Sequence, residues 1–435
     1  MMRGLQRLFA REGDRVGIVL PNGQSYIDVL HALGRIGAVP VLLNTRLTPA
    51  EIQRQTALIG CKAVIDHVDG GVFGAGRLDL DNWGDFLSSQ ADDDQTAAIL
   101  FTSGTSGTPK AAQITYGNLR ALAESAADRL GVDAGDRWLL PLPLYHVGGL
   151  SIVFRSAVQR TAAVLPRDTS TAAIMAALIE EQITHVSLVP TQVYRLIEAG
   201  FVPPPSLKMI LVGGAAASIE LLRAAHERNY PIATTYGLTE ATSQVATMLP
   251  DAVRAKPGSV GKPLKGMTVR VTNEHRIDQP PGTYGDIVIS GAAVMKGYVG
   301  YPETGGMFNT GDIGYFDADG DLWLVQRRTD LIVSGGENVY PAEVESVLRQ
   351  HPAVADVCVV GLPDAEWGER VAAAVLLKTG ACIEPDELAM FSRERLAGYK
   401  VPRLIRVVDA LPMTASGKIM RGAVKAMFAP ERPTA

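Results

Sequence analysis

Cysteine is scarce in this sequence of 435 residues, with three positions only: Cys61, Cys358 and Cys382. They are too few and too far apart for a disulfide framework or a cysteine-rich metal site, so we expect reduced packing residues. A dominant charge is also lacking, because 41 basic and 46 acidic residues leave a net charge of −5. General binders of nucleic acids or membrane surfaces carry a basic footprint, so neither kind of partner is predicted.

Long hydrophobic runs are missing as well. No segment approaches the roughly 20 apolar residues of a membrane-spanning helix. Residues 1–23 contain only a short apolar stretch interrupted by charge, unlike a signal peptide. We therefore expect a cytoplasmic protein without a membrane span. A composition of 47% hydrophobic and 20% charged residues is typical of folded chains, and the length predicts two or three domains.

Short apolar runs alternate with amphipathic stretches along most of the chain. Strands are predicted at 15–20, 39–43, 97–102, 183–189 and 207–212, each followed by a helical pattern, as at 25–36 and 49–59. This alternation predicts an α/β fold, with layered and largely parallel sheets in a large N-terminal domain.

The pattern changes twice further along the chain. From about 256 to 325, short alternating runs are broken by glycine and proline, which predicts a β subdomain of mostly antiparallel strands. Beyond residue 330, helices are predicted at 341–350, 385–396 and the C-terminus, and strands at 354–360, 371–377 and 404–408. The predicted domains are therefore residues 1–328, which include the β subdomain, and a small α+β domain at 331–435.

The strongest single feature is the segment 99–110, Ile-Leu-Phe-Thr-Ser-Gly-Thr-Ser-Gly-Thr-Pro-Lys. Its glycines let backbone N–H groups approach an anion, its five hydroxyls add donors, and Lys110 adds positive charge. It does not match the Walker A pattern. We predict that it binds phosphate through Thr102, Ser103, Gly104, Thr105, Ser106, Gly107, Thr108 and Lys110.

Seven segments in order make the sequence similar to the adenylate-forming superfamily of acyl-CoA synthetases, adenylation domains and luciferases. Besides 99–110, they are 143–146, 213–215, 236–240, 310–312, 327–338 and 412–418. The resemblance implies an enzyme that adenylates a small carboxylic acid with ATP and then transfers the acyl group to coenzyme A. ATP, Mg²⁺ and coenzyme A are the cofactors and substrates it implies.

The resemblance also implies roles for individual residues. The loop at 102–110 would hold the β- and γ-phosphates, Thr239 the α-phosphate and Glu240 the Mg²⁺ ion. Adenine would be bound by Gly213, Gly214, Ala215, Thr235 and Tyr236, and the ribose hydroxyls by Asp312 with the help of Arg327. Gly237 would also belong to the AMP site. Lys418 would reach the α-phosphate during adenylation. His146 would gate the channel for pantetheine, although a histidine in an apolar stretch is otherwise a packed core residue.

Two reaction steps need two arrangements of the site, so the resemblance implies rotation of the C-terminal domain about a hinge at Thr329 and Asp330. Coenzyme A would be bound by Ser334, Gly335, Gly336 and Trp367, although Trp367 is equally explained by packing. No carrier domain is recognised, which favours free coenzyme A as the acceptor. A homodimer is one oligomeric state that the sequence allows.

Segments 141–156, 236–244 and 333–346 are most similar to the o-succinylbenzoate–CoA ligases of menaquinone synthesis. An acid with a second carboxylate favours a basic or hydroxyl-rich site, and the candidates are Ser151, Arg155, Ser243 and Gln244. The alternative for Arg155 is a helix surface. Other aryl- or alkanoyl-CoA ligases and a luciferase-like oxygenase stay open. A non-catalytic acyl-adenylate sensor stays open too, although it would not need Lys418.

Overall fold

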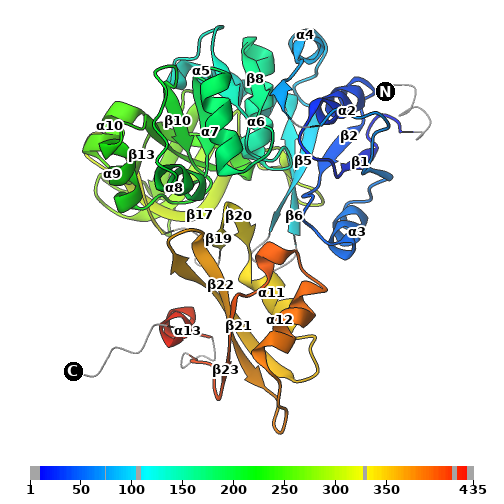
Figure 1. Ribbon diagram of the computed structural model, residues 1–435, viewed down its shortest axis with the longest axis vertical. Helices are drawn as coiled ribbons and strands as arrows, with labels where there is room; N and C mark the ends of the chain where they lie inside the picture. Colours follow the sequence, from blue (N-terminus) through cyan, green and yellow to red (C-terminus); the bar gives the residue numbers. More distant parts are fainter. Residues whose placement is uncertain (1–9, 74, 104–108, 327–330, 414–418, 429–435) are drawn as a thin grey trace. The chain divides into compact units, whose positions relative to one another are not determined.

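The computed structural model describes residues 10–73, 75–103, 109–326, 331–413 and 419–428. The chain divides into two compact units (Figure 1). The first comprises residues 1–45, 56–102 and 111–328, and the second comprises residues 46–55, 103–110 and 329–435.

A six-stranded sheet contains the first strands of the chain. Its order is β16-β6-β5-β2-β1-β3, and β1 pairs in parallel with β2 and β3. The bounds are β1 Arg15–Ile18, β2 Val39–Leu42, β3 Ala63–Ile65, β5 Thr96–Ser103, β6 Pro109–Thr115 and β16 Gly297–Tyr298. Because β16 pairs with β6, Tyr298 lies in the same sheet as the strands that flank the predicted phosphate loop.

A path of twelve strands forms the second sheet, in the order β14-β15-β17-β18-β13-β12-β11-β10-β9-β7-β8-β4. Strands β7 to β11 pair in parallel, and β12 reverses the direction. The bounds are β4 Gly76–Arg77, β7 Arg137–Leu139, β8 Ala162–Leu165, β9 His185–Leu188, β10 Met209–Val212, β11 Ile232–Leu238, β12 Ser243–Met248, β13 Ser259–Pro263, β14 Met267–Thr272, β15 Gly285–Gly291, β17 Met307–Phe316 and β18 Leu322–Gln326.

The predicted α/β fold is confirmed, and the strands from β13 to β18 in this sheet pair antiparallel, as their alternating pattern indicates. They are continuous with the parallel strands, because β13 pairs with both β12 and β18. One prediction is wrong in detail: the next described element after the run at 97–102 is a strand, β6, and not a helix. The helix begins only at Tyr116, where Thr115 and Asn118 form a capping box.

Helices pack on both sheets of the first unit, and α8, α9 and α10 lie together at the left of Figure 1. The bounds of the helices in this unit are α2 Gln24–Arg35, α4 Asp81–Ser89, α5 Tyr116–Leu130, α6 Val147–Gln159, α7 Thr171–Glu180, α8 Pro190–Glu198, α9 Ile219–Glu227 and α10 Pro250–Ala255. Helix α3, Pro49–Leu58, lies mostly in residues 46–55, which belong to the second unit. Helix α6 is unusual because every residue from Gly149 to Ala157 is buried. Each polar side chain of a helix that is buried on all sides needs a hydrogen-bond partner, because burying an unpaired polar group costs free energy.

The sheet of the second unit is buried on both faces. In β21, Val357 and Val359 join the apolar cluster with α11 and α12, whereas Cys358 and Val360 join the cluster with α13. This alternation follows from the two-residue period of a strand, and Figure 1 shows α11 and α12 on one side and α13 on the other. The bounds are α11 Pro341–Leu348, α12 Pro385–Arg393, α13 Arg421–Met427, β19 Ile332–Ser334, β20 Glu337–Val339, β21 Val354–Asp364, β22 Gly368–Leu377 and β23 Leu404–Val408.

All three cysteines are free, but Cys382 is exposed and so is not a packing residue.

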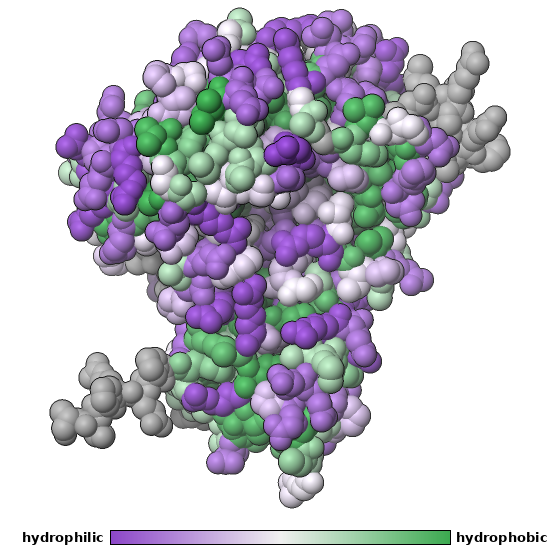
Figure 2. Space-filling model, viewed as in Figure 1, coloured by the Kyte–Doolittle hydropathy of each residue, from purple (hydrophilic) through white to green (hydrophobic). Residues whose placement is uncertain are grey.

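Two surface properties complete the fold. Among the described residues, no helix combines the length and apolar character needed to cross a bilayer. Figure 2 shows hydrophilic and hydrophobic residues interspersed over one face of the molecule. The most exposed large apolar side chains are scattered along the chain, at Val72, Val202, Ile277 and Tyr284, which is ordinary for a folded protein.

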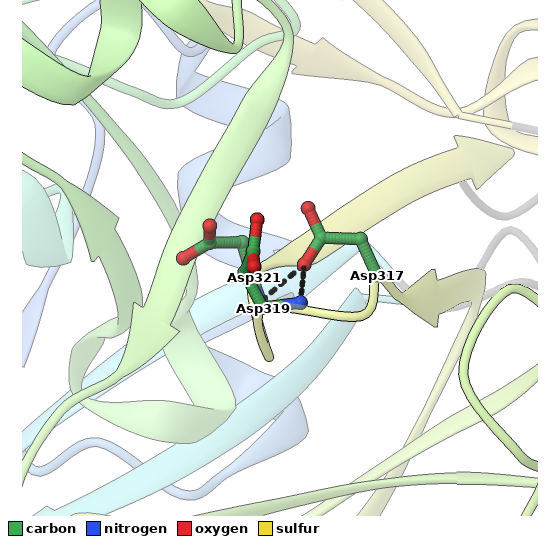
Figure 3. Close-up of side chains that lie close together, drawn as sticks. All are labelled: Asp317, Asp319 and Asp321. Atoms are coloured by element: carbon green, nitrogen blue, oxygen red, sulfur yellow. Dashed lines mark hydrogen bonds between the residues drawn. The ribbon is translucent and has the colours of Figure 1, made fainter.

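Three aspartates gather in the turn between β17 and β18 (Figure 3). The carboxylates of Asp317, Asp319 and Asp321 lie close enough to hold a metal ion. However, the ammonium group of Lys256 lies at 2.8, 2.7 and 2.6 Å from them. Partial burial opposes ionisation of Asp317, but hydrogen bonds from Lys256, the Asp321 backbone and Trp323 lower its pKa from 3.8 to about 2. The ammonium group of Lys256 therefore occupies the position that a metal ion would take in this turn.

Replacing Lys256 with methionine is expected to lower the melting temperature by a few degrees at pH 7, because three carboxylates then repel one another. Since the pKa of Asp317 is lowered on folding, its contribution is present above about pH 4 and is lost as the pH falls towards 2. Melting curves from pH 2 to 7 test both points. The control is Lys262→Met on the exposed side of β13, and an equal effect there would contradict the prediction.

Candidate active site

The predicted adenine residues lie at the carboxyl ends of neighbouring parallel strands. Strand β10 leads into Gly213, and β11, its parallel neighbour, carries Thr235 and Tyr236. A Cβ atom on Gly213 would lie 2.7 Å from Cγ2 of Thr235, so glycine allows the two strand ends to approach. Gly214 has a φ of 77°, in the left-handed region that favours glycine. Ligands of open α/β sheets bind at such strand ends.

The turn from β11 to β12 is tight and strained. A Cβ atom on Gly237 would lie 1.8 Å from the carbonyl oxygen of Ser243, so only glycine fits there. Thr242 and Ser243 have φ values of 56° and 115°, which is unusual for residues other than glycine. The buried hydroxyl of Thr242 donates to the carbonyl oxygen of Ala293 at 2.6 Å and helps to hold this conformation. Backbone strain of this kind is typical of functional sites.

This turn positions Glu240, a residue that is 6% exposed in the short 3₁₀ helix Thr239–Ala241. The hydroxyl of Tyr298 donates a short hydrogen bond to Oε1 of Glu240. Tyr298 comes from β16, the edge strand beside β6. The carboxylate is therefore oriented by a residue 58 positions along the chain.

Tyr236 and Asp312 are joined directly. The Tyr236 hydroxyl donates to Oδ2 of Asp312 at 2.6 Å, and both side chains are buried. Asp312 lies on β17, and its backbone N–H donates to the hydroxyl of Thr310 at 3.1 Å. The structure thus brings together two residues that the sequence assigned to adenine and to ribose.

His146 immediately precedes α6 and is half-buried, so it is not a fully packed core residue. Its imidazole packs edge-on against Tyr145, with ring centroids 4.8 Å apart. Gly149 lets the preceding loop fold onto the helix, because a Cβ atom there would lie 2.2 Å from the carbonyl oxygen of Pro143. The Asn22 side chain donates to the Leu142 carbonyl oxygen at 2.9 Å and fixes the same loop.

The four candidates for acid recognition lie together between α6 and β12, and we call Ser151, Arg155, Ser243 and Gln244 the α6–β12 cluster. Nη1 of Arg155 donates to Oε1 of Gln244 at 2.8 Å, and the hydroxyls of Ser151 and Ser243 are 3.4 Å apart. Nε2 of Gln244 donates to Oγ1 of Thr247 at 3.1 Å, which in turn lies 3.0 Å from Oγ1 of Thr235. Hydrogen bonds therefore connect this cluster to the predicted adenine strand.

Arg155 is 1% exposed, so the alternative of a helix-surface arginine is wrong. Burial lowers the pKa of its guanidinium to about 10, which still leaves it charged at neutral pH. Nε and Nη2 have no hydrogen-bond partner among the described residues. These two donors form one side of the planar guanidinium, the arrangement that binds a carboxylate through two parallel hydrogen bonds.

Within the second unit, the residues expected to bind coenzyme A also meet. Gly335 and Gly336 have φ values of 60° and 84° and form a tight two-residue turn between Ser334 and Glu337. The Gly335 N–H donates to the carbonyl oxygen of Trp367 at 2.9 Å. The guanidinium carbon of Arg403 lies 4.3 Å from the centre of the Trp367 ring.

Several predicted residues fall partly or wholly outside this description. Thr102 lies on β5, Lys110 lies on β6, and both are half-buried. Ser103 ends β5, but its side chain is not described. Outside the described residues lie Gly104, Thr105, Ser106, Gly107, Thr108, Arg327, Thr329, Asp330 and Lys418.

Sequence reasoning missed Tyr298, Thr247 and Trp138, which contact the predicted residues. Each is an isolated residue in a strand. Tyr298 contacts Glu240 and Trp138 contacts Arg155 of α6, so only the tertiary fold brings these pairs together. Thr247 contacts Gln244 on its own strand and Thr235 on the neighbouring strand β11. The local sequence contains no signal for these contacts.

Comparison with known proteins adds a second kind of observation. Residues 2–299 match the family described as AMP-binding enzyme, and residues 343–418 match the AMP-binding enzyme C-terminal domain. The chain is 38% identical to the 2-succinylbenzoate–CoA ligase of Bacillus velezensis over 427 residues, which cover 94% of this chain and 87% of the relative.

Solved structures point to the same relatives. The o-succinylbenzoate CoA synthetase (MenE) of Bacillus subtilis, as a double mutant bound with its product analogue OSB-NCoA, matches with a TM-score of 0.88 at 35% identity. The match covers 98% of this chain and 91% of that chain. The same synthetase in complex with ATP and magnesium ion matches with a TM-score of 0.69 at 34% identity, covering 98% and 92%.

Proposed function

Because this chain belongs to the AMP-binding enzymes and, among them, to the 2-succinylbenzoate–CoA ligases, we propose that it converts o-succinylbenzoate to its CoA thioester. A carboxylate oxygen of the acid attacks the α-phosphate of ATP, and pyrophosphate leaves. The thiol of coenzyme A then loses its proton to the solvent and attacks the carbonyl carbon of the acyl-adenylate, and AMP leaves. The sequence resemblance assigns this reaction to menaquinone synthesis.

One observation carries the choice of acid: the buried Arg155 presents Nε and Nη2 without partners among the described residues. A buried guanidinium costs free energy unless its donors are paired. A carboxylate that accepts from both donors offsets that cost. o-Succinylbenzoate retains a second carboxylate when the first one reacts, so Arg155 binds the one that does not react.

The other residues of the α6–β12 cluster support that assignment. Gln244 accepts from Nη1 of Arg155 and so orients the guanidinium towards an acid. Ser151 and Ser243 supply hydroxyl donors beside it. Their positions at the first turns of α6 and the start of β12 place these groups on rigid elements rather than on a loop.

For ATP, we propose the roles that the resemblance implies. Tyr236 lies against adenine, and it orients the Asp312 carboxylate that accepts hydrogen bonds from the ribose. Thr239 donates to the α-phosphate, and Lys110 with its loop neutralises the β- and γ-phosphates. Fixed positive charge is needed here because a carboxylate approaches a triphosphate of the same sign.

Mg²⁺ fits at Glu240, because a carboxylate oxygen is the ligand that hard cations prefer and Tyr298 orients this one. When bound, the ion neutralises negative charge on the triphosphate. Glu240 and the phosphate oxygens would hold it.

The remaining assignments also stay proposals. They are the role of Lys418 in adenylation, of His146 as a gate, of Ser334 to Gly336 with Trp367 in binding coenzyme A, and of Thr329 and Asp330 as a hinge. A homodimer and a cytoplasmic location are proposals as well.

The test is a panel of acids in two assays with the whole protein. o-Succinylbenzoate should support ATP–pyrophosphate exchange, and its CoA thioester should form in preference to those of benzoate and a fatty acid. If another acid is preferred, the choice of substrate is wrong but the ligase assignment remains. If no acid supports exchange, the chain is a non-catalytic binder of acyl-adenylates.

Glu240→Gln is expected to raise the Mg²⁺ concentration needed for half-maximal turnover by about tenfold or more, because a neutral amide is a poorer ligand for a hard cation. A Mg²⁺ titration at saturating ATP measures this. Glu303→Gln, which changes an exposed acid, serves as the control. An unchanged Mg²⁺ requirement in Glu240→Gln would mean that another residue holds the ion.

A further inference from the structure

Within the α6–β12 cluster, Arg155 also contacts an aromatic side chain. Its guanidinium carbon is 4.2 Å from the centre of the Trp138 ring. That indole also contacts His185, whose ring is stacked on it with centroids 4.6 Å apart and an interplanar angle of 23°. Trp138 is 0% exposed and His185 1% exposed. These three side chains form what we call the arginine stack.

Strand pairing builds this arrangement. Trp138 on β7 and His185 on β9 are paired directly in the parallel register, so their side chains point to the same face of the sheet. Arg155 reaches the indole from α6, the helix that is buried all round. The stack therefore rests on two central strands and one buried helix, which leaves its members little freedom to move.

The charges along the stack are compatible. Burial lowers the pKa of His185 to about 4, against the opposing effect of Asp136, so the imidazole is neutral at pH 7. Nδ1 of His185 lies 2.8 Å from the hydroxyl of Thr184 and 3.8 Å from Oδ1 of Asp136. Nζ of Lys208 lies 2.8 Å from Oδ1 of Asp136 and balances the charge of that carboxylate. The imidazole therefore adds no second positive charge to the stack.

The indole stabilises the guanidinium in a particular way. An aromatic face attracts a cation through its quadrupole, more strongly when both are desolvated, and this uses none of the N–H donors. A carboxylate of the protein in the same place would have taken up the donors that a substrate needs. In the described structure Arg155 makes one side-chain hydrogen bond, to Gln244, and retains Nε and Nη2.

We propose that Trp138, supported by His185, is a positioning residue that holds the Arg155 guanidinium for the second carboxylate of the acid. This inference rests on the proposed function, since it explains how that site selects a dicarboxylic acid. It gives Trp138 a role in specificity, although the indole itself touches Arg155 and not the substrate.

The test compares Trp138→Leu with Trp138→Phe in steady-state kinetics with o-succinylbenzoate, benzoate and ATP. Leucine removes the aromatic face, so we expect the KM of o-succinylbenzoate to rise about tenfold and its kcat/KM ratio over benzoate to fall by a similar factor. Phenylalanine restores a face and should recover most of the ratio. The KM of ATP should stay within about twofold in both variants.

Trp83→Leu is the matched control, because Trp83 is also buried and packs edge-on against Phe154, the neighbour of Arg155 in the chain. It should lose stability without changing the ratio. If Trp138→Leu does not fold, Trp138→Met takes its place, since it fills more of the volume without a ring. An unchanged ratio in the folded variant overturns the inference and leaves the proposed function intact, provided that Arg155→Ala lowers the ratio. If the unmodified protein does not prefer o-succinylbenzoate, the proposed function itself is wrong.

Discussion

Lys418→Ala should lower ATP–pyrophosphate exchange with o-succinylbenzoate by about 10²- to 10³-fold, the usual effect of losing a donor that stabilises charge in the transition state. By the resemblance, Lys418 reaches the α-phosphate as the attacking carboxylate and the departing pyrophosphate both carry negative charge. Formation of the thioester from supplied acyl-adenylate should change by less than about threefold, because the same lysine has no part in that step.

The two half-reactions therefore separate the effect from general damage to the protein. Lys425→Ala is the control, since Lys425 lies on the following helix α13 and is half exposed. It should leave both half-reactions unchanged. Equal loss of both half-reactions in Lys418→Ala would contradict the idea that the enzyme uses different arrangements for its two steps.

Hydrophobic periodicity predicted the elements of the fold well. The helices expected at 25–36 and 49–59 are α2, Gln24–Arg35, and α3, Pro49–Leu58, and the strand expected at 404–408 is β23 with the same bounds. Local pattern decides these elements, because each has an apolar face that must be buried. Pairing between strands depends on segments that lie far apart in the sequence. For this reason the junction of the predicted β subdomain with the parallel strands could not be foreseen.

The candidate active site shows the same difference between features that the local sequence reveals and features that only the tertiary fold creates. Motifs identified Glu240 and Asp312, because unusual residue types at fixed spacing are visible in the chain. Their orienting partners Tyr298 and Tyr236 differ in this respect: Tyr236 belongs to a motif, whereas Tyr298 is one tyrosine among twelve. A contact made by pairing β16 with β6 leaves no local pattern. Burial is equally invisible, so the sequence could not exclude a surface position for Arg155.

Arg155→Ala is expected to lower the o-succinylbenzoate-to-benzoate ratio of kcat/KM by about ten- to a hundredfold. Charge-assisted hydrogen bonds of the kind that Nε and Nη2 would make are worth roughly 1.5–3 kcal/mol each. Benzoate has no second carboxylate to lose, so its own kcat/KM should change little. The KM of ATP should be nearly unaffected. Arg120→Ala on α5, where the arginine is partly exposed and pairs with Asp93, is the control and should preserve the ratio.

A second variant at the same position distinguishes recognition from a purely structural role. Arg155→Met removes the charge and the donors but keeps an unbranched, apolar side chain of similar length against Trp138. Replacing a buried ion by a packed apolar group is often neutral or stabilising. We therefore expect Arg155→Met to melt at the same temperature or higher without ligand, while losing the preference for o-succinylbenzoate. If Arg155 served the fold rather than the substrate, methionine would lower the melting temperature and preserve the ratio, because the fold does not distinguish one acid from another.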